Sequence, residues 1–380
     1  MAPTRGAAGA RKTRARARPK ASQADERSQS FLIYGANGFL GEAIARLAVA
    51  RGMRPIIAGR NAEGIARLAA ELGLEHLAFG LDDADAVDNA LGRVAVVLHC
   101  AGPYVHTWQA MAGACLRTGT HYLDLTGELP VFEALAALDG EAREAGVMLL
   151  PGVGFDVVPT DCLAVHLRRR LPAATRLTLA FQSRGPAGLP PGTQRTMIEL
   201  LPSGIRVRRN GELVAPGRGE GTRLVDFGRG PVNTALVPWG DVFTAWYSTG
   251  IPHITDYMAM PAYLRLPLAG ARLLTPLLRM APVRDLLKKA VLPGPAAWAR
   301  ARTRTHVYGE VEDARGRRAA ARLHGPEAGV EWTSETALGA VAKVLAGTAP
   351  PGFQTPGLAF GPDFVLECGE VQREDLPEQG

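Results

Sequence analysis

The stretch that decides the fold reads Phe31-Leu32-Ile33-Tyr34-Gly35-Ala36-Asn37-Gly38-Phe39-Leu40-Gly41. Its first four residues are apolar, as in a buried strand, and the apolar residues over 39–51 recur at helical spacing. Glycines at this junction are typical of a phosphate-binding turn: Gly35 permits the tight turn, Gly38 lets the backbone approach a pyrophosphate, and Gly41 lets helix and strand pack closely. The spacing Gly-x-x-Gly-x-x-Gly is a variant of the commoner pattern. The alternative is a glycine-rich turn without a ligand.

The residues around this turn alternate short apolar runs with amphipathic helical stretches, which is typical of a parallel sheet with crossover helices. We predict strands over 31–34, 55–58, 77–79, 94–99, 122–125 and 147–150, and a single helix over 130–146. Six strands in about 120 residues are the size of a doubly wound nucleotide-binding domain. The fold class is therefore α/β, with an N-terminal Rossmann domain over 30–155.

After this domain the sequence reads as strands and turns, with a turn signal at Asn210-Gly211. We predict a second α+β, largely antiparallel domain over 156–370, which serves substrate binding and dimerisation. Residues 371–380 are read as a C-terminal tail. Within the second domain, 256–295 is apolar, basic and predicted to be helical. Such a segment packs on the core, or forms a substrate tunnel or a homodimer contact, or lies on a membrane interface.

The charge of the chain is concentrated at its N-terminus. Residues 1–30 hold eight basic and two acidic side chains, and the remainder has 35 of each sign. We therefore expect 1–29 to be a disordered basic tail and expect no specific nucleic-acid binding. A weak anchor to anionic lipid and a transit peptide are the alternatives. The four cysteines lack metal-ligand spacing, so no metal is expected and a cytoplasmic location fits best, with membrane association left open.

The end of the second predicted strand indicates which nucleotide binds. An NAD-preferring site usually has an acidic side chain there, on the ribose 2′-hydroxyl. Here the sequence continues with Arg60 and Asn61 and has no carboxylate before Glu63. Arg60 could pair with a 2′-phosphate and Asn61 could add a hydrogen bond. Asp82 either contacts the adenine side or caps a helix together with Asp83. The sequence thus predicts NADP(H).

Three further segments carry a family resemblance. They are His99-Cys100-Ala101-Gly102-Pro103-Tyr104, then 119–128 with Asp124-Leu125-Thr126-Gly127-Glu128, then Gly154-Phe155-Asp156-Val157-Val158-Pro159-Thr160-Asp161. With the glycine turn, they resemble the saccharopine dehydrogenase-like oxidoreductases, most closely the branch of bacterial trans-acting enoyl reductases. The motifs cover about residues 30–170. Val157 and Val158 depart from the pattern of true saccharopine dehydrogenases, which argues against an amino-acid diacid as substrate.

These segments predict a site, because loops at the carboxyl ends of parallel strands meet at one edge of the sheet. Ala101, Gly102 and Pro103 would lie under the nicotinamide ring. Tyr104 is a candidate proton donor or an aromatic packed on the cofactor. Glu128 and Asp156 are candidate acids or bases, and Asp156 could instead cap the helix near Pro159. Asp124 is read as a buried hydrogen-bond anchor.

The predicted function is an NADP(H)-dependent oxidoreductase that acts on a C=C or C=O bond of a small or lipid-like substrate. Two alternatives remain open: an NADPH-binding sensor or scaffold without turnover, and a saccharopine-type amino-acid reductase. The predicted cofactor-binding residues are Gly35, Ala36, Asn37, Gly38, Phe39, Leu40, Gly41, Arg60, Asn61, Asp82, Ala101, Gly102 and Pro103.

Overall fold

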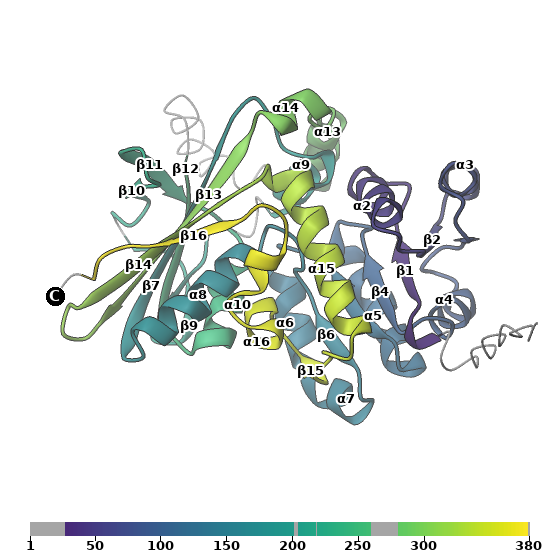
Figure 1. Ribbon diagram of the computed structural model, residues 1–380, viewed down its shortest axis with the longest axis horizontal. Helices are drawn as coiled ribbons and strands as arrows, with labels where there is room; N and C mark the ends of the chain where they lie inside the picture. The colour runs from purple at the N-terminus through teal and green to yellow at the C-terminus, as the bar shows by residue number, and fades with distance from the viewer. Residues whose placement is uncertain (1–26, 201–203, 218, 260–279, 379–380) are drawn as a thin grey trace, which may run out of the picture.

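The chain folds into two β-sheets with helices packed between and around them (Figure 1). The computed structural model describes residues 27–200, 204–217, 219–259 and 280–378. In the first sheet all neighbouring strands pair in parallel, in the order β15-β6-β5-β4-β1-β2-β3. This arrangement confirms the predicted Rossmann-like α/β fold. Residues 1–26, most of the predicted basic tail, lie outside the described residues.

The elements of the first sheet follow the predicted alternation. The strands are β1 (Phe31–Tyr34), β2 (Ile56–Gly59), β3 (His76–Ala78), β4 (Val96–His99), β5 (His121–Asp124) and β6 (Met148–Leu150). The helices are α2 (Phe39–Ala50), α3 (Ala62–Leu72), α4 (Ala84–Leu91), α5 (Trp108–Thr118), α6 (Leu129–Ala137) and α7 (Asp139–Glu144). The single helix predicted over 130–146 is wrong, because the chain leaves helical geometry at Leu138 and starts a second helix.

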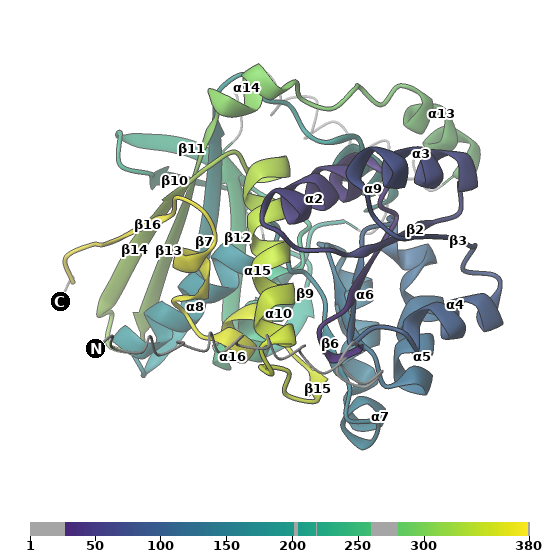
Figure 2. The same ribbon diagram turned by 45° about the vertical axis from the view of Figure 1, so that its right-hand side comes forward.

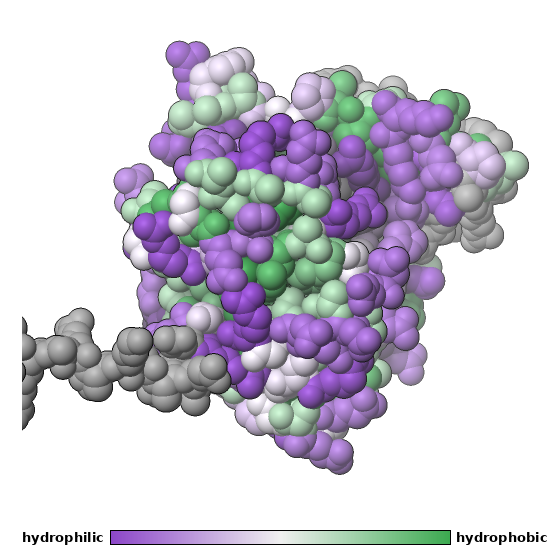
Figure 3. Space-filling model, turned by 90° about the vertical axis from the view of Figure 1, so that its right-hand side faces the viewer, coloured by the Kyte–Doolittle hydropathy of each residue, from purple (hydrophilic) through white to green (hydrophobic). Residues whose placement is uncertain are grey.

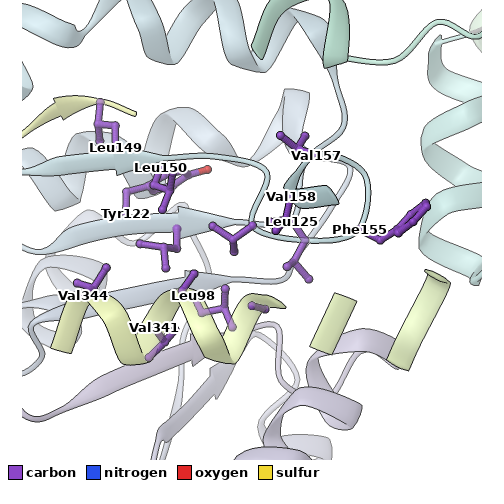
Figure 4. Packing of buried hydrophobic residues seen from close by; sticks show 14 of the residues in the cluster. Leu98, Tyr122, Leu125, Leu149, Leu150, Phe155, Val157, Val158, Val341 and Val344 are labelled. Carbon is purple, nitrogen blue, oxygen red and sulfur yellow. The ribbon is translucent and has the colours of Figure 1, made fainter. Parts of the chain in front are cut away.

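The end of the chain completes the first sheet. Strand β15 (Gly352–Phe353) pairs in parallel with β6, and α15 (Thr333–Leu345) packs against β4 and α2. Figure 4 shows Val341 and Val344 of α15 beside the strands that carry Leu98 and Tyr122, all four of them core residues. Residues within the range 156–370 therefore belong to the core of the nucleotide-binding sheet.

The second sheet is mixed. Its strands are β7 (Ala174–Arg184), β8 (Val207–Arg209), β9 (Glu212–Val214), β10 (Thr222–Asp226), β11 (Pro231–Leu236), β12 (His253–Ala259), β13 (Arg304–Asp313), β14 (Arg318–Gly325) and β16 (Gln372–Asp375). Most pairs are antiparallel, but β12 runs parallel to β7. Asn210 (φ 50°) and Gly211 (φ 82°) form the predicted tight turn between β8 and β9.

Helices of the second half cover this sheet and face the first. They are α8 (Val158–Arg170), α9 (Pro191–Leu200), α10 (Asp241–Thr249), α13 (Ala281–Lys289), α14 (Ala297–Ala301) and α16 (Pro356–Phe360). The helical prediction for 256–295 is wrong at its start, because 256–259 belong to β12, which pairs with β7 and β11. It is confirmed over α13 and is wrong again over 291–295, which are not helical, while 260–279 lie outside the described residues.

A connection from the second half reaches across to the glycine turn. Figure 2 shows α13 and α14 along one side of the molecule, and α13 packs against α9. The Gln194 amide of α9 bonds the backbone of Leu292 twice, at 2.9 and 3.1 Å. Gly294 packs so closely on the Phe39 ring that a Cβ there would lie 2.3 Å from it. These contacts cover the start of α2 from the outside.

Hydrophobic side chains also reach the surface. Figure 3, which looks onto the side of α3 and α4, shows apolar side chains in the middle of that face between hydrophilic ones. Within the described ranges, no helix combines the length and the apolar character needed to cross a bilayer.

Candidate active site

A cleft of about 1580 Å³ opens at the carboxyl edge of the first sheet. Loops that follow β1, β2, β4, β5 and β6 line one wall. Residues of α9 and of the segments 204–206 and 236–239 line the other. In an open parallel sheet, this edge is where ligands bind. The cleft therefore brings the predicted nucleotide loops together with residues of the second half.

The glycine turn lies at the centre of this cleft. Gly35 has φ 81°, and Gly38 begins α2 without a side-chain cap, which leaves the helix N-terminus to a ligand. A Cβ on Gly41 would lie 2.3 Å from the Gly35 carbonyl oxygen, so only glycine fits. Of the predicted turn residues, Gly35, Asn37, Gly38, Phe39 and Leu40 line the cleft, whereas Ala36 is fully buried behind it.

The three polar residues predicted for the ribose and adenine side all line the cleft. Arg60 is exposed at the end of β2, and no hydrogen bond or ion pair within the described ranges engages its guanidinium. Asn61 accepts a hydrogen bond from Gly64 N (3.0 Å) and thereby caps α3. Asp82 folds back over Gly80, and it is the next residue, Asp83, that caps α4 through Ala86 N (3.0 Å). The free cation at β2 fits a 2′-phosphate.

Beyond β4, Ala101, Gly102 and Pro103 form part of the cleft wall, with Tyr104 packed beside them. A Cβ on Gly102 would lie 3.3 Å from the Tyr104 ring. The ring is only 7% exposed, and burial raises the pKa of Tyr104 well above its usual value, with the neighbouring acids adding to the effect. Tyr104 is therefore a neutral phenol near neutral pH, which can donate a hydrogen bond to a substrate oxygen.

Glu128 does not line the cleft, because its side chain is 1% exposed and lies behind the wall. Its carboxylate accepts hydrogen bonds from Tyr104 N (2.9 Å), Val105 N (2.7 Å) and the Thr196 hydroxyl (3.1 Å). Burial raises the pKa of Glu128, and these donors oppose the rise. The placement favours a positioning role: Glu128 joins the loop after β4 to helix α9 on the opposite wall.

Asp156 lies on the cleft wall beside Gly127, where a Cβ would be 3.2 Å from its Oδ2. Within the described ranges no donor reaches this carboxyl. Helix α8 begins after Val157 without a side-chain cap, so the alternative that Asp156 caps it is wrong. Burial, with Glu128 nearby, raises the pKa of Asp156 to about 6. Asp156 can therefore hold or release a proton near neutral pH.

Asp124 is the buried anchor that the sequence predicted. Its carboxyl bonds the Tyr122 hydroxyl (2.5 Å), Thr126 N (2.9 Å) and Gly152 N (2.9 Å). These bonds tie the loop after β5 to the loop after β6, and so they set Gly127 and Asp156 side by side.

Two further acids were missed by sequence reasoning. Asp241, at the start of α10, and Asp256, in β12, are each 1% exposed and lie behind Asp156. They are far from Asp156 along the chain and in no motif, so the sequence held no local signal for them.

The comparisons with known proteins agree with this geometry. Residues 31–150 match the model of the saccharopine dehydrogenase NADP binding domain. This part of the chain is therefore similar to the NADP-binding domain of saccharopine dehydrogenases. The match confirms the predicted cofactor, NADP(H), and the residues fit it: the glycine cradle admits a pyrophosphate and the free Arg60 admits a 2′-phosphate.

Relatives of the NADP-binding domain are reductases by name. A trans-acting enoyl reductase of Mycobacterium leprae is 36% identical over 155 residues, which are 39% of this chain and 37% of that protein. A saccharopine dehydrogenase-like oxidoreductase of Bos taurus is 25% identical over 188 residues, 43% of each chain. The alignment thus spans little more than a third of the enoyl reductase.

One solved structure resembles the whole fold. Apo saccharopine dehydrogenase (L-Glu forming) from Saccharomyces cerevisiae superposes with a TM-score of 0.62 at 12% identity and covers 92% of this chain and 100% of that chain. The likeness confirms that the NADP-binding domain is joined to a second sheet in the manner of saccharopine dehydrogenase.

Proposed function

We propose that this protein is an NADP(H)-dependent oxidoreductase that transfers hydride to or from a C=C or C=O bond of a small or lipid-like substrate. One observation carries the proposal: the cleft continues from the phosphate-binding turn past Tyr104 and Asp156 to a wall contributed by the second half of the chain. The names of the similar enoyl reductases support the same reaction class.

The size and lining of the cleft support a second ligand beside the nucleotide. Pockets for a single small molecule measure about 300–1,000 Å³, and this cleft holds about 1580 Å³. Its far wall is mainly apolar, and the residues are Leu189, Met197, Ile205, Leu236, Val237, Trp239 and Met258. An apolar wall favours a lipid-like substrate over a polar one.

The chemistry divides between cofactor and chain. Bound NADPH would supply the hydride. Tyr104 and Asp156 lie where a proton is needed on the substrate as the hydride arrives, and both groups hold a proton at mildly acidic pH. Glu128 holds the Tyr104 backbone in place and closes the cleft toward α9.

A saccharopine-type amino-acid reductase is less well supported. Such a substrate carries several carboxylates and would call for a convergence of cations. Among the described residues of the cleft, Arg195 and Arg206 are the arginines away from the nucleotide turn, and apolar side chains outnumber them.

The test is turnover measured together with nucleotide affinity. We expect Tyr104→Phe and Asp156→Asn to lower kcat about 100-fold or more, with NADPH affinity nearly unchanged. Asp85→Asn, an exposed carboxyl on α4, should keep full activity. Gly38→Asp should abolish both binding and turnover. Full turnover in Gly38→Asp would overturn the assignment, and tight NADPH binding without reduction of any enoyl thioester or ketone would favour the sensor alternative.

We also propose that the exposed apolar side chains of the α13–α14 segment contact a lipid surface. Leu286, Leu292 and Trp298 are 67%, 69% and 61% exposed, and Lys289 lies exposed among them. Apolar anchors beside a cation suit an anionic interface. Co-sedimentation with anionic vesicles tests this contact, and a homodimer seen by ultracentrifugation without vesicles would assign the surface to a second copy instead.

A further inference from the structure

The buried carboxyl groups of Asp241 and Asp256 are unusual because nothing in the described ranges neutralises them. Both side chains are 1% exposed. Asp241 Oδ2 and both oxygens of Asp256 lack a donor from any other residue, and no arginine, lysine or histidine is paired with either group. Burying an ionised carboxylate without a partner costs on the order of several kcal/mol in folding free energy, so the pair must hold protons.

The two carboxyls lie close enough for their charges to interact. Besides burial, Asp241 raises the pKa of Asp256, because two like charges in one buried place repel each other. The Thr160 hydroxyl lies against Asp241 Oδ1 and also donates to the Val157 carbonyl (2.9 Å). Burial, together with the charge of Asp156, raises the pKa of Asp241 to about 7, and burial together with the charge of Asp241 raises the pKa of Asp256 well above its usual value.

The pair is coupled to the cleft through Asp156. The charge of Asp156 acts on Asp241 and raises its pKa. The backbone holds the two regions together, since Gly240 N donates to the Gly127 carbonyl (3.1 Å) and Gly127 packs on Asp156. The titratable groups facing this cluster are Glu128 on the side of α6, Asp241 on α10 and Asp256 on β12, and the buried Arg208 of β8 donates to the Val242 carbonyl (2.8 Å) beside Asp241.

The acids lie at the end of the cleft that the nicotinamide ring would occupy. The pyrophosphate belongs at the turn after β1, and Arg60 after β2 marks the adenosine side. The other half of the nucleotide must then extend over the loops after β4, β5 and β6, where Asp156 lies. The oxidised ring is a cation and the reduced ring is neutral. A cation beside a carboxyl favours its ionised form.

We propose that Asp241 and Asp256, together with Asp156, form a proton store at the nicotinamide end of the cleft, and that its proton content falls when the oxidised nucleotide is bound. This inference rests on the proposed function, because it requires NADP(H) to bind with its ring at this end. Each carboxyl that ionises passes one proton to the solvent or to a substrate in the cleft. Asp241 and Asp256 act through Asp156 and are positioning residues.

The experiment compares the affinities of NADP⁺ and NADPH between pH 6 and pH 8, by calorimetry in two buffers of different ionisation enthalpy. Both nucleotides carry the same phosphates, so phosphate titration cancels in the ratio of their Kd values. We expect the ratio Kd(NADP⁺)/Kd(NADPH) to fall about threefold or more over this range, with proton release on binding NADP⁺ only.

The variants separate the buried pair from the rest of the protein. Asp241→Asn/Asp256→Asn should lose the part of the pH dependence that the buried pair supplies and keep the part due to Asp156, and Asp85→Asn should keep all of it. If a thermal melt shows that the double variant does not fold, the single variant Asp241→Asn replaces it in the test. We expect the single variant to lose less of the pH dependence than the double variant would. If the folded variant shows the same pH dependence of Kd(NADP⁺)/Kd(NADPH) as the wild type, the proton store is overturned and the proposed function is not affected. Failure of the wild-type protein to bind either nucleotide would instead overturn the proposed function.

Discussion

At the scale of single residues, Arg60 and Glu128 show how differently a local motif predicts a role. Arg60 is the residue directly after β2, so the end of this strand alone places it at the cleft. Glu128 ends the loop between β5 and α6, and its carboxylate turns inward to three donors. The direction of a side chain in a loop depends on which donors the rest of the fold places around it.

We propose that Arg60 sets the preference for NADPH over NADH, because it lines the cleft at the end of β2. We expect Arg60→Ala to weaken NADPH binding about 10- to 100-fold, as for the loss of a charge-assisted hydrogen bond, and to leave NADH binding unchanged. Fluorescence titration with each nucleotide measures this difference. Arg67→Ala, which removes another arginine of the neighbouring helix α3, is the matched control. Equal losses for NADPH and NADH would contradict the role of Arg60.

At the scale of elements, α9 is the helix that joins the two walls of the cleft. Thr196 donates to Glu128, and Glu199 one turn later pairs with Arg284 (3.2 Å) and Lys288 of α13 and lies 3.7 Å from His106. These contacts link the loop after β4, α9 and α13 in one chain of interactions. A helix held by a few side-chain bonds can open at modest cost.

We therefore expect Thr196→Val to speed the release of NADPH about 5- to 10-fold, because a hydrogen bond to a charged acceptor contributes ~1.5 kcal/mol. Stopped-flow fluorescence measures the rate. Thr193→Val alters the same helix at a cleft-lining hydroxyl with no hydrogen bond to Glu128, so it should release NADPH at the wild-type rate. The same rate in both variants would show that α9 does not hold the nucleotide in place.

At the scale of the whole molecule, the buried acids tie stability to pH. Burial raises the pKa of Asp124 and Asp241 to about 7, above the value of 3.8 in the unfolded chain. The folded protein thus binds more protons than the unfolded chain between these values. The contribution of these two acids to the free energy of unfolding is fully present below about pH 4 and is lost as pH rises through 7. Exposed carboxylates with lowered pKa values, such as Asp139 and Glu220, act in the opposite sense at lower pH.

We expect the melting temperature of the wild-type protein to fall by several degrees from pH 6 to pH 8. Asp241→Asn/Asp256→Asn should show a smaller fall, since its amides do not ionise. Calorimetric or circular-dichroism melts at the two pH values measure both slopes, and Asp85→Asn should follow the wild type. An equal fall in the double variant would mean that these two acids titrate alike in the folded and unfolded states.

The sequence by itself determined the strand, turn and helix over 31–50, the cofactor and the presence of six strands along the first domain, because each depends on neighbours along the chain. Tertiary structure decided the rest. Strand β12 was hidden in an apolar segment because its pairing with β7 and β11 outweighs its local helical pattern. Strand β15 joins the first sheet from the far end of the chain. The grouping of Asp156, Asp241 and Asp256 depends on long-range packing, which brings together acids that no local spacing relates.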